Sequence, residues 1–244
     1  MANIQATTTP LQFITGDICS HTFRHGFVCI VYSTNAITCK NFGLSKYIAD
    51  TYPYGNVAGI RYSNDRGIAQ RSDRGVEGST IIERPADHQL NLPAVATLIT
   101  QYGIGKAFEV NEVSARVARY TKDADHARRL QLDTTLNRVK KFEDCLLNLR
   151  SDMGKEEYKN IEVILIPVGI ACGGVMTIEW IDYYLPLIDN FSRSVEVIGK
   201  KVLLIINNSH KEKLEESRRA VNVLDRIPVY TENITSIFGK DVCK

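Results

Sequence analysis

Several features are missing from this sequence of 244 residues, and each absence excludes a class of protein. The 30 lysines and arginines are almost balanced by 28 aspartates and glutamates, and a formal net charge of +2 is too small to indicate nonspecific binding to nucleic acid. No apolar run is long enough to cross a membrane. The N-terminus has no basic segment followed by an apolar one, so we expect no secretory signal.

The cysteines do not form a disulfide or metal-binding pattern. None falls in a C-x-x-C pair, and with 44% hydrophobic residues the chain can build a core without disulfides. We therefore expect reduced thiols and an intracellular, cytoplasmic location. His21 and His25 lie near two of the cysteines without the spacing of a zinc finger, so we expect no metal site, and we expect no cofactor. The cysteines are Cys19, Cys29, Cys39, Cys145, Cys172 and Cys243.

Short apolar segments alternate with segments of helical periodicity. This alternation predicts an α/β fold, a three-layer α/β/α sandwich with a mixed, largely parallel sheet. We expect strands at residues 11–15, 26–32, 79–83, 94–100, 161–167 and 201–206, and helices at residues 44–52, 123–150, 178–191 and 210–224. The helix over 123–150 carries the clearest apolar stripe, made of Leu132, Leu136, Val139, Phe142, Leu146 and Leu149.

No internal repeat and no low-complexity linker divides the chain, so we expect a single domain over residues 11–227. Residues 1–10 are polar and are expected to form a loose lead-in. Two insertions are expected within the domain, a surface excursion near residues 55–78 and a second insertion near residues 103–120. Residues 228–244 form a C-terminal tail to which we assign no role.

The most informative stretch covers residues 161–191, which read as a buried strand, a glycine loop and a helix. Gly169, Gly173 and Gly174 lie in the loop among small residues. A glycine turn between a strand and a helix exposes backbone N–H groups at the positive end of the helix dipole, which favours a phosphate. The alternative is a loop whose glycines only allow the chain to turn.

Four segments together resemble the macrodomain family, which binds ADP-ribose. The resemblance covers about residues 11–206 and implies a macrodomain-like fold. The segments are FITGDI at residues 13–18, VCIVYSTN at residues 28–35, residues 43–52 before Pro53, and residues 164–174 followed by Glu179 and Trp180.

The resemblance also implies a set of ligand-binding residues. Asp17, next to Ile18, matches the residue that accepts a hydrogen bond from the exocyclic amine of adenine, and Asn35 matches an asparagine near the distal ribose. Phe42 is placed to pack against a ribose or base, beside Gly43 of the first loop. The backbone of the second loop would hold the diphosphate through Gly169, Ile170, Ala171, Cys172, Gly173 and Gly174.

Each of these assignments has a structural alternative. Asp17 is also typical of a turn or a helix N-cap, and Asn35 is also typical of a turn. Phe42 is equally a buried hydrophobic staple. A thiol near a helix N-terminus, such as that of Cys172, can be reactive, but a small residue that fills loop space is the preferred interpretation. Trp180 and Phe191 are expected in the core.

The chain also departs from the family pattern. The first loop keeps only Gly43, and the side chains of Asn41 and Phe42 would narrow the cleft. Gln101 stands where some relatives carry a catalytic lysine, and no acid lies between Val168 and Thr177, so that covalent route is not expected. His21, His25 and His126 lack an acid or base partner at recognisable spacing, so we assign no catalytic residue.

Three functions remain open on the sequence. The first is binding of ADP-ribose, an ADP-ribosylated protein or a related nucleotide, with hydrolysis of an ADP-ribose linkage or of ADP-ribose 1''-phosphate as a possible activity. The second is a non-enzymatic structural or self-assembling protein with a degenerate pocket. Nucleic-acid binding is disfavoured, because acidic neighbours dilute the basic region formed by Arg116, Arg119, Lys122, Arg128, Arg129, Arg138, Lys140 and Lys141.

Overall fold

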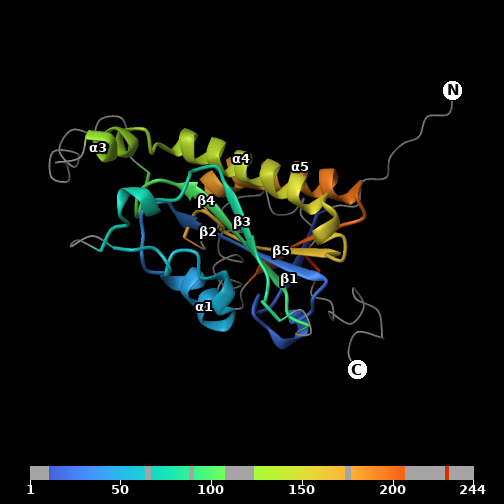
Figure 1. The fold of residues 1–244 in the computed structure, drawn as a ribbon. Helices are drawn as coiled ribbons and strands as arrows, with labels where there is room; N and C mark the ends of the chain where they lie inside the picture. The colour runs from blue at the N-terminus through green and yellow to red at the C-terminus, as the bar shows by residue number, and fades with distance from the viewer. Residues whose placement is uncertain are drawn as a thin grey trace.

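The computed structural model describes residues 11–63, 67–87, 91–107, 124–173, 177–206 and 229–230. They form a seven-stranded sheet in the order β3-β4-β2-β5-β6-β1-β7, in which all neighbours are parallel except β3 and β4 (Figure 1). The strands are β1 (Gln12–Thr15), β2 (Val28–Asn35), β3 (Thr80–Glu83), β4 (Ala94–Gln101), β5 (Val163–Pro167), β6 (Lys201–Ile206) and β7 (Val229–Tyr230).

Helices cover both faces of the sheet. Figure 1 shows α4 (Thr135–Met153) and α5 (Leu185–Glu196) above it and α1 (Gly43–Thr51) below it. The remaining helices are α3 (Ala124–Gln131), the short η1 (His21–Phe23), η2 (Pro53–Gly55), η3 (Arg71–Asp73) and η4 (Glu156–Tyr158), and the π-helix η5 (Trp180–Tyr184). The predicted three-layer sandwich with a mixed, largely parallel sheet is confirmed.

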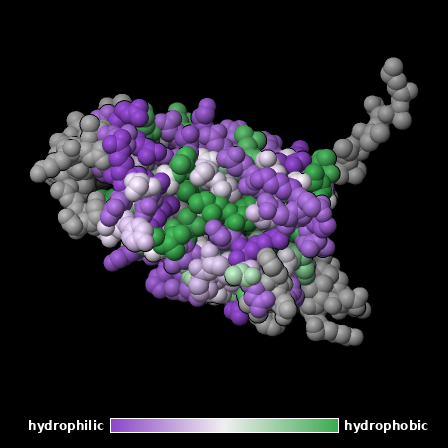
Figure 2. All heavy atoms as spheres, viewed as in Figure 1, coloured by the Kyte–Doolittle hydropathy of each residue, from purple (hydrophilic) through white to green (hydrophobic). Residues whose placement is uncertain are grey.

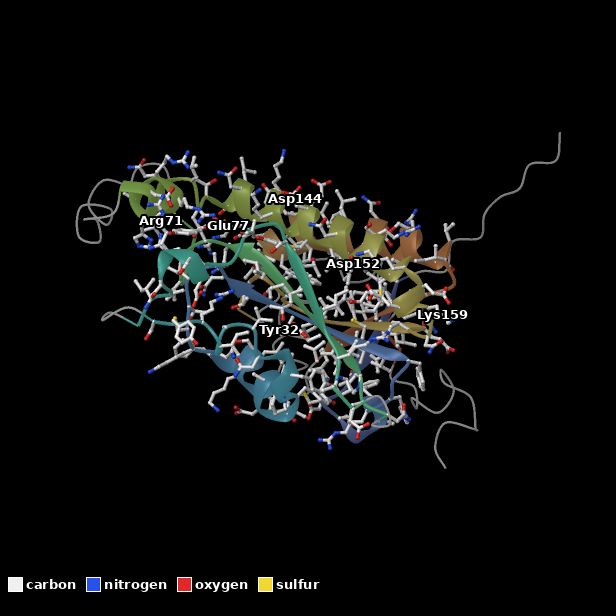
Figure 3. The ribbon with its side chains drawn as sticks, viewed as in Figure 1. Tyr32, Arg71, Glu77, Asp144, Asp152 and Lys159 are labelled. Atoms are coloured by element: carbon white, nitrogen blue, oxygen red, sulfur yellow. The ribbon has the colours of Figure 1, made fainter. Side chains whose placement is uncertain are left out.

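Two of the three hydrophobic clusters in the described residues lie on opposite faces of β2, because side chains alternate between the two faces along a strand. In β2, Cys29 and Val31 pack into the cluster that contains Phe142 of α4, whereas Ile30 and Tyr32 pack into the cluster of α1. The hydroxyl of Tyr32, labelled in Figure 3, donates to the carbonyl of Gly55 at 2.7 Å inside the second cluster. Because both faces of β2 are buried from Val28 to Tyr32, this part of the strand is apolar, as parallel central strands are.

The prediction of one continuous helix over residues 123–150 is wrong, because the helix is interrupted between α3 and α4. The carboxylate of Asp133 accepts the backbone N–H groups of Tyr102 at 3.2 Å and Gly103 at 2.9 Å, and these bonds tie it to the end of β4. It also receives the guanidinium of Arg138 at 2.9 and 2.6 Å. Thr134 then caps α4 through Asn137.

The break also changes the predicted apolar stripe. Phe142, Leu146 and Leu149 are buried as expected. Leu132 and Leu136 are instead 53% and 69% exposed, because at the break and in the first turn of α4 the inward positions are taken by Asp133 and Arg138, which are buried.

β2 is longer than predicted. The strand was expected to end at Tyr32, but Ser33, Thr34 and Asn35 continue it because β4 pairs with it as far as Gln101. Polar residues at the carboxyl end of a central strand gave no period-2 pattern from which the extension could be recognised. The extension places Ser33 and Asn35 at the edge of the sheet where the site is built.

The helix predicted over residues 178–191 begins with the π-helix η5. Pro186, near the start of α5, lacks the N–H that a continuous α-helix would direct to the carbonyl of Asp182, so the regular ladder is interrupted at this point. Trp180 and Phe191 are buried, as expected of core residues.

The segment predicted as a surface excursion, residues 55–78, packs more deeply than expected. The guanidinium of Arg61 is buried and donates to the carbonyls of Asn35 at 2.8 Å and Thr38 at 3.0 Å. The N–H of Ala69 donates to Ile37 at 2.8 Å. This segment therefore holds the chain that leaves β2.

Several predicted segments lie outside the described residues: the lead-in 1–10, the helix 210–224, most of the insertion 103–120 and all of the tail except Val229 and Tyr230. The domain boundaries stay predictions. Within the part of the chain that the structure describes, no helix combines the length and apolar character needed to cross a bilayer.

Replacement of Asp133 by alanine should lower the free energy of unfolding by about 3–5 kcal/mol, because it leaves the Arg138 guanidinium buried without its carboxylate. Urea unfolding measures the change. Asp189→Ala is the matched control, since it removes a more exposed carboxylate from its pair with Arg193 and should cost less than about 1 kcal/mol. Equal effects of the two substitutions would show that Asp133 does not hold the break between α3 and α4.

Candidate functional site

A cleft of about 380 Å³ opens at the carboxyl ends of β1, β5 and β6, beside the start of α1. In an open α/β sheet this edge is where ligands bind, because the strands end there and the loops diverge. The described residues that line the cleft are Gly16, Asp17, Ile18, Gly43, Leu44, Tyr47, Pro167, Val168, Gly173 and Ile205.

The two glycine turns predicted to form the site meet in this cleft, since both Gly43 and Gly173 line it. Their φ angles are +53° and +70°, in the left-handed region that favours glycine. A Cβ atom added at either position would meet no heavy atom of the described residues within 4 Å. The cleft therefore exposes bare backbone from two segments that lie 130 residues apart in the sequence.

The first turn presents the N-terminus of α1. The hydroxyl of Ser45 donates to the carbonyl of Phe42 at 2.8 Å and accepts its N–H at 3.2 Å, which closes the cap. Among the described residues, no acceptor lies within hydrogen-bond distance of the N–H groups of Gly43 and Leu44. These donors lie at the positive end of the helix dipole.

The second turn uses most of its amides internally. The N–H of Ala171, whose φ is +64°, donates at 3.0 Å to the hydroxyl of Ser33 and so fixes the turn to β2. In the described part of the chain, only the N–H groups of Gly169 and Gly173 in residues 168–173 lack an acceptor. The other internal bonds run from Val168 to Ile205, from Ile170 to Pro167 and from Cys172 to Gly169.

Asp17 and Tyr47 form a polar wall of the cleft. One carboxylate oxygen of Asp17 accepts the N–H of Cys19 at 2.9 Å, which is the turn geometry expected as an alternative. The other accepts the hydroxyl of Tyr47 at 2.6 Å. This hydrogen bond raises the pKa of Tyr47 to about 12. Tyr47 was not among the predicted site residues, although its position one helical turn after Gly43 indicates a residue on the cleft side of α1.

Several predicted site residues lie away from the cleft. The side-chain oxygen of Asn35 accepts the N–H groups of Ile37 at 3.0 Å and Thr38 at 2.7 Å, so Asn35 shapes the turn after β2. Ile170 is buried in the core. Gly174 lies outside the described residues. Whether any of these residues contacts a ligand stays a prediction.

The side chains expected to narrow the cleft point away from it. Phe42 is 67% exposed and does not line the cleft. The amide of Asn41 donates to Asn56 at 2.5 Å, on the side of the segment 55–78. Among the described residues, neither Asn41 nor Phe42 therefore lines the cleft.

His25 and His126 are not among the described residues that line the cleft. His126 exchanges a hydrogen bond of 2.8 Å with the hydroxyl of Tyr102, next to the break before α4. His25 stacks on Phe27 with ring centroids 5.0 Å apart. Among the described residues, no group of three or more His, Cys, Asp or Glu side chains gathers closely enough to hold a metal ion.

A second hollow, of about 510 Å³, lies between the end of β4, α3 and α4, and is lined by four residues of the predicted basic region, Arg128, Arg129, Arg138 and Lys141. Its cations already have carboxylate partners, so they do not present a free positive surface. The pairs are Arg128 with Asp125, Arg129 with Glu77, Arg138 with Asp133 and Lys141 with Asp144. Glu77 and Asp144 are labelled in Figure 3.

No protein-family model matches the chain, and no curated protein gives a significant match. Solved structures match at low identity. An alphavirus P23pro-zbd gives a TM-score of 0.44 at 10% identity over 92% of this chain, which spans only 26% of that protein. A protein from Bacteroides thetaiotaomicron gives a TM-score of 0.48 at 15% identity, and the match covers 80% of this chain and 99% of that protein. An Oceanobacillus iheyensis macrodomain with ADP gives a TM-score of 0.44 at 14% identity, and the match covers 86% of this chain and 93% of that protein.

The mixed, largely parallel sheet between helical layers is the α/β fold expected from the sequence. Because the TM-scores are below 0.5, the assignment of the site rests on the chain's own geometry.

Cys172 should react slowly with iodoacetamide in the folded protein. Burial raises the pKa of its thiol from 9.0 to about 12, so its thiolate fraction at pH 8 is about a thousandfold below that of an ordinary thiol. Mass spectrometry of the tryptic peptide over time measures the rate, with the urea-unfolded chain as the control. Equal rates in the folded and unfolded chains would show that the turn does not shield Cys172.

Proposed function

We propose that the chain binds ADP-ribose or a related nucleoside diphosphate in the cleft between Asp17, Gly43 and Gly173. The observation that carries the proposal is the meeting of the two bare glycine turns at the carboxyl edge of the parallel sheet. An elongated ligand with a base at one end and a diphosphate in the middle matches the arrangement of a carboxylate wall beside free backbone amides.

The diphosphate would accept hydrogen bonds from the two turns. The donors are the N–H groups of Gly43 and Leu44 at the start of α1 and those of Gly169 and Gly173 in the second turn. Charge-assisted bonds to backbone amides are stronger than neutral ones, and the dipole of α1 adds to them. The base would lie at the Asp17 end, between the walls formed by Ile18 and Tyr47.

Two further points support binding over a filled, structural cleft. Phe42 and Asn41 do not line the cleft, and the Oceanobacillus iheyensis macrodomain matched above is described with ADP. In the described lining the titratable side chains are Asp17 and Tyr47, which bond to each other at the base end. We therefore propose binding as the function and assign no hydrolytic residue.

Gly173→Ala should weaken ADP-ribose binding by at least about tenfold, equivalent to ~1.4 kcal/mol, because a methyl group would occupy the space that the diphosphate needs. Isothermal titration calorimetry measures the dissociation constant. The same substitution at a positive φ costs about 1–2 kcal/mol of stability wherever it is made.

Gly199→Ala is the matched control. Gly199 has a φ of +75°, close to the +70° of Gly173, and also has open space at its Cβ position. It precedes β6 and therefore lies at the opposite, amino edge of the sheet. Gly199→Ala should lose similar stability and keep wild-type affinity. Absence of binding by the wild-type protein at millimolar ADP-ribose would refute the proposed function.

A further inference from the structure

The strand β3 forms one edge of the sheet, and in the described part of the chain no strand pairs with its outer side. The N–H of Ile99 in β4 donates to the carbonyl of Ser79 at 3.0 Å, which identifies Ser79 as a residue whose backbone faces β4. Backbone groups alternate along an antiparallel strand, so those of Thr80 and Ile82 point away from β4. An edge of this kind is a template for a further strand.

Apolar side chains lie along this edge. Ile82 packs against the cluster that contains Phe142 of α4, and Ile81 packs on the other face against the cluster that contains Tyr102. Both isoleucines are only half-buried. Figure 2 shows apolar surface over the part of the molecule where β3 crosses the front of the sheet in Figure 1. The outer side of β3 therefore favours contact with protein over contact with water.

An acidic groove of about 340 Å³ lies at the start of β3, between the strand and α4. The charged side chains in its described lining are those of Glu77 and Asp144, both labelled in Figure 3. The side chain of Asp144 is 35% exposed and pairs with Lys141 through one carboxylate oxygen, which leaves the other oxygen for a second cation. Val76 and Leu147 give the groove an apolar lining and are 66% and 64% exposed.

A cation lies at the other end of the edge. Arg84 follows β3 and stacks its guanidinium on the ring of Tyr158, 4.8 Å from the ring centroid. Among the described residues its Nη2 has no hydrogen-bond acceptor. Arg84 comes two positions after Ile82, so the two side chains share the face that α4 covers, which is also the face of Asp144. The edge is therefore acidic at its start and basic at its end.

We propose that β3 pairs with β3 of a second copy of this chain, antiparallel and about a two-fold axis at Ile81. In this register Thr80 of each copy lies opposite Ile82 of the other, and the two pairs exchange about four backbone hydrogen bonds. The two Ile81 side chains meet at the axis, on the face opposite α4.

The same register matches the two ends of the edge. Arg84 of one copy lies opposite Gly78 of the other, where a Cβ atom would be 3.0 Å from the carboxylate of Asp144. The guanidinium that lacks an acceptor thus meets the acidic groove at both ends of the interface. Because each copy supplies both the groove and the arginine, the surface is self-complementary, as a two-fold interface requires. A second copy is therefore the occupant that this edge fits, and the inference does not depend on nucleotide binding.

Sedimentation equilibrium measures the association. Since β3 has only 4 residues, the interface is small, and the wild-type chain should show a reversible monomer–dimer equilibrium with a dissociation constant of about 10–100 µM. Ile82→Pro removes an outward N–H group that no described residue of the same copy accepts. It should raise the dissociation constant by about tenfold or more and leave the chain folded, since an edge strand tolerates proline at such a position.

A charge swap tests the register. Asp144→Arg and Arg84→Asp should each weaken self-association by about tenfold or more, because each places like charges together at both ends of the dimer. An equimolar mixture of the two variants should dimerise nearly as well as the wild type, since both arginine–aspartate contacts form again between unlike copies.

Asp189→Arg is the matched control, because its side chain is 33% exposed and pairs with Arg193 on α5, which packs against β6 and not against β3. It should leave the dissociation constant unchanged, and thermal unfolding confirms that every variant is folded. A wild-type chain that stays monomeric at about 500 µM overturns the inference and leaves the edge to a strand of another protein. A mixture that stays as dissociated as its two components overturns the antiparallel register. Neither outcome bears on ADP-ribose binding, which calorimetry measures separately.

Discussion

The parallel pairing of β5 between β2 and β6 is the constraint on which the site depends. Residues Val28 to Ile30 pair with Val163 to Leu165, and β5 in turn pairs with β6 over its whole length. Parallel strands deliver their carboxyl ends to one edge, so the turn after β5 and the start of α1 after β2 meet without any direct pairing between them. The hydrogen bond from Ala171 to Ser33 then fixes the second turn to β2.

The cleft relies on backbone geometry more than on charged side chains. Asp17 is the one charged residue in its described lining, and it is acidic. Any anion held there would be stabilised by amide dipoles and the helix terminus, which act at short range and are weakly screened once water is excluded. Such a site discriminates by shape and hydrogen-bond direction, in contrast to a basic groove that attracts any polyanion.

The polar character of the surface is uneven. Figure 2 shows apolar residues gathered across the middle of the face on which β3 crosses the front of the sheet in Figure 1. β3 is an edge strand of four residues with half-buried Ile81 and Ile82 at its centre. Its shortness limits the unpaired edge that it offers to another chain.

The sequence was sufficient to predict six of the seven strands and the helical layers, because apolar strands and helical periodicity are local patterns, but it did not predict the two-residue strand β7. It also predicted that Gly43 and Gly173 share a site. It did not reveal the break at Asp133, since that break is held by amides of Tyr102 and Gly103 about 30 residues earlier in the chain. The pairing of Tyr47 with Asp17 and the outward turn of Phe42 are likewise decided by tertiary contacts that no local pattern records.

Arg138 has one more effect on the architecture. Besides its bond to Asp133, its guanidinium donates to the carbonyls of Gly105 at 2.7 Å and Lys106 at 3.3 Å. These hydrogen bonds hold the first residues after β4 against the first turn of α4. Chain beyond these bonds can lengthen, shorten or change composition during evolution without transmitting the change to the sheet, so this is a place where the fold tolerates the acquisition of new sequence.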